Sequence, residues 1–407
     1  MAESEQSWEM FPVRMFMIYV LFYAGQAMYN TFLNLFLYNH GMQMDQIGFL
    51  SSFSTLVLVL IQPLWGVLSD KSKSKNRIIA MLLIVSAIAL LSFYAMQAAL
   101  WLSFCVVFFN VFFNPAVTLQ DNYTLELLEH SRWDFGQLRL GGTVGYAVCS
   151  LLVGFIIGTN YGQIFWMMAL LFLSTAVLYF TSPNIAGHRQ KHQKVKYSVI
   201  LKNKMLVSMF LFNIVYYIGT AFYYQFYSIY FQETLGASSG MVGMLSMFSA
   251  LAEIPFFWFA AKLQKRFGTR NLLLFAGIAT AFRWFTLAFA TAHWMVLAIN
   301  MLNGCGFVGF SYSLIKFIND NVPKEMRATT QSLNGILGIL FSRIIFTPIG
   351  GVLADRFGVQ PVLIANGVLI TLGVVLFAVS YARLQKQHEL GSRIILFFDP
   401  EGYRALH

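Results

Sequence analysis

An acid and a base stand out within a chain of long apolar segments. Asp121 and Arg139 lie nine residues before and nine residues after His130, which sits in a short polar turn. If two antiparallel helices meet at that turn, this spacing amounts to roughly 13 Å of rise on each side, so the two side chains would face each other inside a membrane. An ionisable residue at that depth costs several kcal/mol and marks a candidate functional site. The alternative is an ion pair that only clamps two helices together.

Small and polar neighbours crowd this pair, which favours a binding site over a clamp. Asn122 follows the acid directly, and three glycines follow the base at Gly141, Gly142 and Gly145. We therefore predict that Asp121, Asn122 and Arg139 bind a ligand.

A second acid and base lie in the other half of the chain. Glu253 and Arg283 occupy neighbouring apolar segments and could form a second pair. Because a buried carboxyl group that loses its arginine partner can take up a proton, we assign Asp121, Glu253 and Arg283 to proton coupling, with a static ion pair as the alternative. Arg343 is a further base whose helix face the sequence does not settle, and a position at a helix end is equally compatible with it.

Tyrosines and amides recur in the same apolar segments. Tyrosine and asparagine side chains can bind hydroxyl groups, and aromatic faces can stack on rings. Ordinary packing is the alternative for each of them. The residues in question are Tyr23, Tyr29, Tyr217, Tyr223, Tyr224, Asn30, Asn34 and Gln225.

The composition is that of a membrane protein. Of 407 residues, 58% are hydrophobic and 11% are charged, whereas soluble proteins are about 25% charged. The net charge of +10 is explained by basic loops facing the cytoplasm rather than by nucleic-acid binding. The three cysteines all lie in apolar segments and show neither a disulfide framework nor a metal-ligand spacing.

A window of about 20 residues predicts an all-α integral membrane protein with twelve transmembrane helices. The expected spans are 13–38, 46–69, 78–96, 100–126, 136–158, 164–182, 206–232, 239–261, 271–291, 294–319, 329–354 and 361–382. Lysines and arginines cluster in alternate loops, which predicts that both termini are cytoplasmic; the opposite side would hold only Arg356.

The longest polar connection divides the spans into six and six. We expect an N-terminal six-helix bundle (1–182), a basic cytoplasmic linker (183–205), a C-terminal six-helix bundle (206–382) and a cytoplasmic tail (383–407). The segment GVLSDKSKSKNR after the second span is faintly repeated as AAKLQKRFGTRN after the eighth, and such internal repeats are typical of secondary transporters.

These motifs resemble the major facilitator superfamily, and within it the branch of proton-coupled symporters that contains lactose permease and the phenylpropionate transporters. QPLWGVLSDK resembles the superfamily signature after the second span, and FGQLRLGGTVGY resembles the fifth-span signature of the lactose-permease branch. KRFGTRNLLLFAGIATAFR and NDNVPKEMRATTQSLNG also resemble segments of this branch.

The resemblance implies roles for particular residues. Arg139 would be the arginine that binds substrate and couples transport, Asp121 its carboxylate partner, and Tyr146 an aromatic residue that stacks on a sugar ring. Arg283 would take the place of the ninth-span arginine. Gly66 and Asp70 would belong to a gate, in which Asp70 accepts hydrogen bonds from a neighbouring helix N-terminus or an arginine when the cytoplasmic side is closed.

The chain also departs from lactose permease. Where that branch carries a histidine and a glutamate for proton coupling on the tenth span, this chain has Asn303 and Gly306, and the seventh span carries no carboxylate. Lactose is therefore a doubtful substrate, and the proton path must differ. We place Asn303, with Tyr29 and Asn30, among the expected substrate-binding residues.

Together these features predict a secondary active transporter, not an enzyme, that imports a small polar organic solute such as a glycoside, nucleoside or aromatic acid by alternating access. We expect a proton gradient as the energy source, no cofactor or metal, and no nucleic-acid partner. The partners are the solute, protons and the lipid bilayer, and the protein is expected to be a multi-pass monomer of the cell inner (plasma) membrane. The alternatives are a proton-driven multidrug or metabolite exporter and a flippase for lipid-linked precursors.

Overall fold

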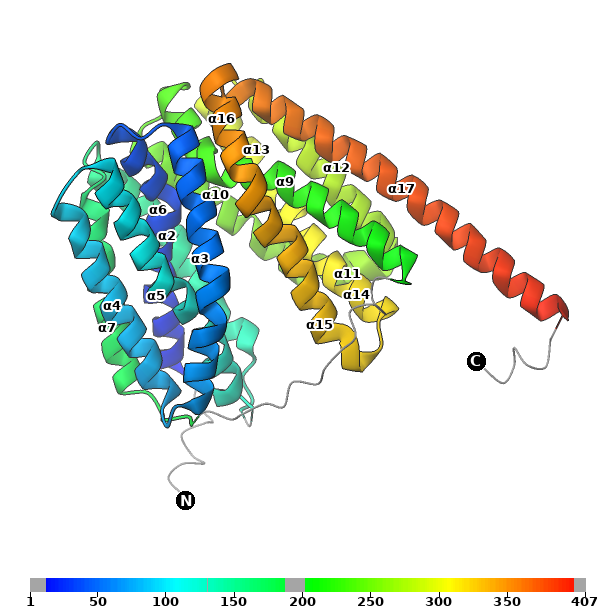
Figure 1. Cartoon of the computed structure of the whole chain (residues 1–407), viewed down its shortest axis with the longest axis horizontal. Coiled ribbons are helices and arrows are strands. Elements are labelled where there is room, and N and C mark those ends of the chain that lie inside the picture. The colour runs from blue at the N-terminus through cyan, green and yellow to red at the C-terminus, as the bar shows by residue number, and fades with distance from the viewer. Residues whose placement is uncertain (1–11, 130, 187–201, 399–407) are drawn as a thin grey trace.

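The computed structural model describes residues 12–129, 131–186 and 202–398, and its regular elements within these ranges are all helices (Figure 1). The first half of the chain forms one bundle. Its helices are α2 (Val13–Asn39), α3 (Met44–Lys71), α4 (Lys75–Leu91) with a 3₁₀ turn η1 (Ser92–Tyr94), α5 (Ala99–Leu127), α6 (Phe135–Ile157) and α7 (Gln163–Phe180).

The second half forms a bundle whose spans are more often interrupted. Its continuous helices are α9 (Lys204–Glu233), α12 (Thr269–Ala288) and α17 (Val359–Phe398). Three spans consist of shorter pieces, namely α10 (Ser239–Leu251) with α11 (Glu253–Phe267); α13 (His293–Asn300) with the π-helical turn η2 (Gly304–Val308) and α14 (Gly309–Asn321); and α15 (Lys324–Gly335) with the π-helical turns η3 (Ile336–Leu340) and η4 (Ser342–Phe346) and α16 (Thr347–Phe357).

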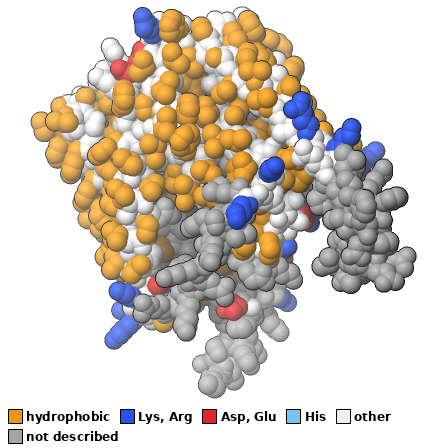
Figure 2. Space-filling model, turned by 45° about the vertical axis from the view of Figure 1, so that its right-hand side comes forward, with side chains coloured by type: hydrophobic (Ala, Val, Ile, Leu, Met, Phe, Trp, Pro, Cys, Tyr) orange, Lys and Arg blue, Asp and Glu red, His pale blue; other side chains and the backbone are white. Residues whose placement is uncertain are grey.

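The helices have the length and the surface of membrane spans. In the part of the chain that the structure describes, 11 helices are long and apolar enough to cross a membrane. The remaining long helix, α2, has 27 residues and lies against α6 and α7 inside its bundle. Figure 2 shows one face covered largely by hydrophobic side chains, with lysines and arginines mainly toward its edges. The expected all-α architecture is confirmed, and the expected spans agree with these helices to within a few residues over most of their length.

The two bundles are joined at one end of the molecule, which we call the Met44 end. It holds the turns at 40–43, 158–162, 234–238 and 289–292. Here α3 packs on α16 and α6 packs on α10, and Tyr161 donates a hydrogen bond of 2.5 Å to the Gln232 side chain across the interface. Toward the opposite end, the Lys75 end, the bundles diverge (Figure 1). The structure is therefore closed at the Met44 end.

The linker and the tail are described only in part. Residues 187–201 of the expected linker, His130 in the polar turn and residues 399–407 lie outside the described ranges. The last helix does not end near residue 382 as expected but continues to Phe398. Residues 383–387 are Arg, Leu, Gln, Lys and Gln, all good helix formers, so nothing in this segment ends the helix.

Candidate functional site: a polar cavity between the bundles

A cavity of about 900 Å³ lies between the two bundles and is lined by both of them. This volume lies within the range of small-molecule sites. Its lining carries two acids and two bases, together with tyrosines, asparagines and glutamines. Of the residues that we expected in the site, those that line the cavity are Asp121, Arg139, Tyr146, Tyr29, Asn30, Asn303 and Glu253.

Asp121 and Arg139 line the same cavity but do not form the expected ion pair. Asp121 accepts a hydrogen bond of 2.9 Å from the Tyr19 hydroxyl, and the guanidinium of Arg139 lies 3.8 Å from the centre of the Tyr23 ring. The rings of Tyr19 and Tyr23 stack with centroids 6.0 Å apart. The acid and the base are thus each held by one tyrosine of α2, which corrects the prediction that Asp121 holds the guanidinium directly.

Gly142 makes the position of Arg139 possible. A Cβ atom at Gly142 would lie 2.6 Å from Nη1 of Arg139 and 2.8 Å from the Tyr23 ring. Only a residue without a side chain leaves the guanidinium room to lie flat on the aromatic face, where the cation–π attraction is strongest. The glycines after the arginine therefore serve the site as well as helix packing.

Glu253 is positioned by a break in its span. Pro255 has no N–H to donate to the carbonyl of Leu251, and the helix is interrupted between α10 and α11 at Ala252. Glu253 is the first residue after this break and faces the cavity. Interrupted helices at mid-membrane are where transporters commonly bind substrates and coupling ions.

Glu253 and Arg283 are connected through an amide rather than by direct contact. The Asn303 side chain donates a hydrogen bond of 3.1 Å to Glu253 and accepts one of 2.7 Å from Arg283. Arg283 also donates to Asn300, lies over the Tyr223 ring and is only 3% exposed. The expected pair is therefore a bridged one. Arg283 lies behind the cavity wall, because it is not among the residues that line the cavity.

Asn303 owes its role to the adjacent π-helical turn. It directly precedes η2 (Gly304–Val308), and Gly304 packs against the backbone at Ala252, where the neighbouring span is broken. The side-chain oxygen Oδ1 of Asn303 also accepts a hydrogen bond of 3.0 Å from the Tyr224 hydroxyl. One buried amide thus joins an acid, a base and a tyrosine from three different spans.

Arg343 projects into the cavity, a location that the sequence left open. It lies in η4 and lines the cavity together with Leu340 and Ser342. Its side chain is exposed within the cavity, and it forms no hydrogen bond or ion pair with the described residues.

The remaining expected binding residues differ in their surroundings. Tyr29 accepts a hydrogen bond of 2.6 Å from Asn110, which orients its hydroxyl at the cavity wall. Asn30 is exposed toward the cavity and Tyr146 is half-buried in its lining. Asn122 is exposed on α5 and does not line the cavity, so the helix turns it away from Asp121.

Gly66 and Asp70 lie in the last two turns of α3 at the Lys75 end, outside the cavity. Asp70 is exposed and makes no hydrogen bond or ion pair within the described chain. Its gating role stays a prediction, because the bundles are apart at this end.

A contact between the two bundles, which we did not predict, occurs at the Met44 end. Asp355, in the last turn of α16, accepts hydrogen bonds from the backbone N–H groups of Met44 (3.2 Å) and Asp45 (2.7 Å), which begin α3 in the other bundle. A carboxylate at a helix N-terminus is stabilised by the helix dipole. The sequence carried a signal for it, because GVLAD at 351–355 repeats GVLSD at 66–70.

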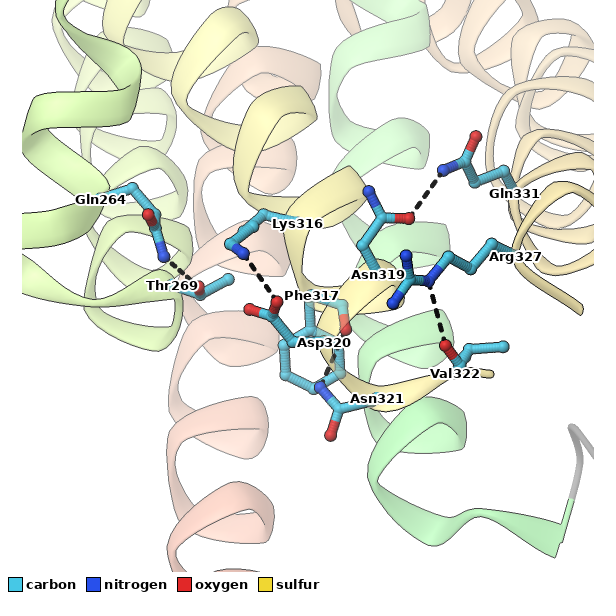
Figure 3. Close-up of polar contacts among 10 residues, drawn as sticks. All are labelled: Gln264, Thr269, Lys316, Phe317, Asn319, Asp320, Asn321, Val322, Arg327 and Gln331. Carbon is cyan, nitrogen blue, oxygen red and sulfur yellow. Dashed lines mark hydrogen bonds and ion pairs between the residues drawn. The ribbon is translucent and has the colours of Figure 1, made fainter. Parts of the chain in front are cut away.

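Polar contacts at the Lys75 end of the C-terminal bundle stay within that bundle (Figure 3). Asn319 of α14 accepts a hydrogen bond of 3.3 Å from Gln331 of α15, and Arg327 donates to the Val322 carbonyl at 3.1 Å. Lys316 and Asp320 form an ion pair of 2.8 Å on one helix. The first two contacts hold the turn between α14 and α15, and none of the three joins the two bundles.

Comparisons with known proteins agree with this architecture. The model of the MFS_1 like family matches residues 13–365. The chain is 22% identical to the uncharacterized transporter YwbF of Bacillus subtilis, with 87% of this chain and 89% of the relative aligned. It is 24% identical to the maltose permease of Geobacillus stearothermophilus (81% and 84% aligned) and 27% identical to a probable 3-phenylpropionic acid transporter of Escherichia coli (71% and 76% aligned).

Solved structures show the same fold. The crystal structure of the nucleoside transporter NupG superposes with a TM-score of 0.80 at 16% identity, covering 91% of this chain and 98% of that one.

Proposed function

The chain belongs to the MFS_1 like family, and we propose on that basis that it imports a small polar organic solute by alternating access, driven by protons. The observation that carries this proposal is the central cavity, which both bundles line and which is closed at the Met44 end. A site between two halves that rock about it is the general design of secondary transporters. One chain supplies both walls, so we propose that a monomer suffices.

The polar lining supports a solute that combines hydroxyl groups with a ring. The amides of Asn30 and Asn34 can bind hydroxyls, and the tyrosines offer aromatic faces. Relatives named for maltose and 3-phenylpropionic acid, and a structural neighbour named for nucleosides, fit this chemistry. We propose a glycoside, a nucleoside or an aromatic acid as the substrate class.

We propose Glu253 as the proton-carrying group. It faces the cavity, and its hydrogen-bond partner among the described residues is the neutral amide of Asn303 rather than a cation. A buried carboxylate without a direct cationic partner is costly, and taking up a proton removes that cost. Rearrangement of Asn303 between Glu253 and Arg283 would then link protonation to the state of the cavity.

Transport by the purified protein in liposomes tests this proposal. Uptake of labelled maltose, uridine and 3-phenylpropionate is measured with and without a pH gradient. One proton per neutral solute and one pH unit support accumulation of about tenfold, and a protonophore should abolish it. Absence of uptake for the whole panel, with or without the gradient, would contradict import; gradient-driven expulsion would instead indicate the exporter alternative.

The Glu253→Gln variant tests the coupling role. We expect it to lose proton-driven accumulation and to retain exchange of internal for external solute, because exchange requires no net deprotonation. Glu233→Gln is the matched control, since Glu233 is exposed at the end of α9 and does not line the cavity. Full accumulation by Glu253→Gln would remove Glu253 from the coupling role.

A further inference from the structure

We propose that Arg343 binds a carboxylate group of the transported solute, so that the substrate is an organic anion with a ring or hydroxylated body. This inference rests on the proposed function, because it concerns the solute that occupies the same cavity. It narrows the substrate class from polar solutes in general to those that carry a carboxylate.

The position of Arg343 leaves its charge uncompensated. The guanidinium lines the cavity and forms no ion pair or hydrogen bond with any residue in the described ranges. A cation in the middle of a membrane protein costs several kcal/mol unless it is paired or hydrated. An unpaired arginine that faces a ligand-sized cavity is therefore expected to pair with an anionic group of the ligand.

The other cavity arginine is in a different electrostatic situation. Arg139 is stacked on Tyr23, and its field acts on both Asp121 and Glu253. The titratable groups near Arg343 are the tyrosines Tyr29, Tyr217 and Tyr224, whose neutral hydroxyls carry no compensating charge, and no carboxylate of the described residues is among them. When Glu253 carries a proton, as proposed above, the charge of Asp121 balances that of Arg139, and the charge of Arg343 remains to attract an anion.

The groups around Arg343 suit the rest of such a solute. Tyr29, Tyr217 and Tyr224 surround it and line the cavity. Their rings offer faces for stacking, and Tyr224 already directs its hydroxyl to Asn303. A single guanidinium fork matches one carboxylate in a bidentate contact.

The backbone explains how an arginine in this span reaches the cavity. Arg343 lies in η4, the second of two π-helical turns that separate α15 from α16. A π-helical turn changes the face on which the following side chains appear, and such turns are common at functional sites. The regular periodicity of an α-helix therefore does not assign Arg343 to a face.

Binding of matched acids and neutral analogues to the purified full chain tests the inference. The probes are 3-phenylpropionate and gluconate, each beside a neutral counterpart, 3-phenylpropionamide and glucose. We expect the wild type to bind at least one acid more tightly than its counterpart. Arg343→Gln should weaken binding of that acid about 30-fold and abolish the preference, and Arg343→Lys should give an intermediate loss.

Two controls separate binding from structure. Arg356→Gln changes an exposed arginine of α16 in the same span, outside the cavity, and should bind like the wild type. Because Arg343 has no protein partner to lose, Arg343→Gln should melt no lower than the wild type. If that variant does not fold, the inference is overturned, since the arginine would then support structure.

Other results would also overturn the inference or the proposed function. Equal binding of the acid by Arg343→Gln and the wild type would overturn the inference, as would a wild type that prefers the neutral counterparts or binds glucose 6-phosphate but neither acid. Transport of neutral solutes with an unaffected Arg343→Gln variant would leave the proposed function standing and remove this inference alone. Absence of any transport would remove the proposed function itself.

Discussion

The charged side chains of the cavity contact tyrosines and an asparagine rather than the oppositely charged residues that we expected. Arg139 lies on Tyr23, Asp121 is bound by Tyr19, and Glu253 meets its base through Asn303. Each charged group is thus kept in place without being neutralised in direct contact. This leaves Arg139 and Glu253 open to a substrate or a proton.

Arg139 is expected to depend on its planar guanidinium. Arg139→Lys keeps the charge but cannot stack flat on Tyr23 or present a fork of donors. We expect a folded protein that binds its transported solute about 100-fold more weakly, measured by titration of the purified variant. Arg132→Lys, an exposed arginine of the neighbouring turn, should bind normally.

The double variant Asp121→Asn with Arg139→Gln distinguishes a binding pair from a clamp. No ion pair joins the two residues in this structure. Removing both charges should therefore not restore the binding that removal of either charge alone abolishes. We expect the double variant to fold and to remain unable to bind; binding equal to that of the wild type would show that the pair only clamps two helices.

The sequence predicted which charged side chains line the cavity better than it predicted the partners that they contact. Asp121, Arg139 and Glu253 could be predicted because charges are conspicuous within apolar spans, and all three line the cavity. The orientation of Arg343 and the bridge through Asn303 could not be predicted. Both depend on π-helical turns, which break the regular period on which assignment to a helix face relies.

Helices α3 and α16 run in opposite directions, and each carries a similar five-residue segment near its end, GVLSD at 66–70 and GVLAD at 351–355. At the Met44 end, Asp355 of α16 binds the N-terminus of α3. Asp70 occupies the corresponding place on α3 at the Lys75 end and is unpartnered among the described residues. We therefore expect the two carboxylates to hold opposite ends closed in alternation.

Asp355→Ala should destabilise the state that is closed at the Met44 end. Loss of a helix-capping carboxylate costs about 1 kcal/mol, which changes the ratio of the two conformations about fivefold. The measurement is the rate at which a thiol reagent applied from the Met44 side modifies a cysteine introduced at Asn30 in the cavity.

Asp70→Ala is the matched variant and should have the opposite effect, slowing modification from the Met44 side. Equal rates in Asp355→Ala and the parent protein would show that the contact does not contribute to closure.

Across the whole molecule, the number of spans and most of their limits follow from hydropathy, the end of α17 at Phe398 being the exception. Interruptions such as the one at Ala252 do not, because the residues on both sides of a break remain apolar. The packing of α3 on α16 and of α6 on α10 was also beyond prediction, since it depends on contacts between distant segments that no local pattern records.

Cytoplasmic placement of the Lys75 end is the expected topology, because basic residues gather in its loops. Lys73→Cys and Asn160→Cys place single exposed thiols at the two ends. In intact cells an impermeant thiol reagent should modify the cysteine at 160 and not the one at 73. The reverse pattern would contradict the orientation and with it the placement of both termini.

The length of α17 has a mechanical consequence. Its 40 residues span about 60 Å, twice the hydrocarbon thickness of a bilayer, and Figure 1 shows it extending beyond the bundle. Residues 383–398 alone add about 24 Å, so a tilt of about 10° would swing the far end by about 4 Å. A rotation of the C-terminal bundle would therefore move the end of α17 farther than it moves the bundle itself. A fluorophore on the last turn of α17 would detect this movement during the transport cycle without contacting the cavity.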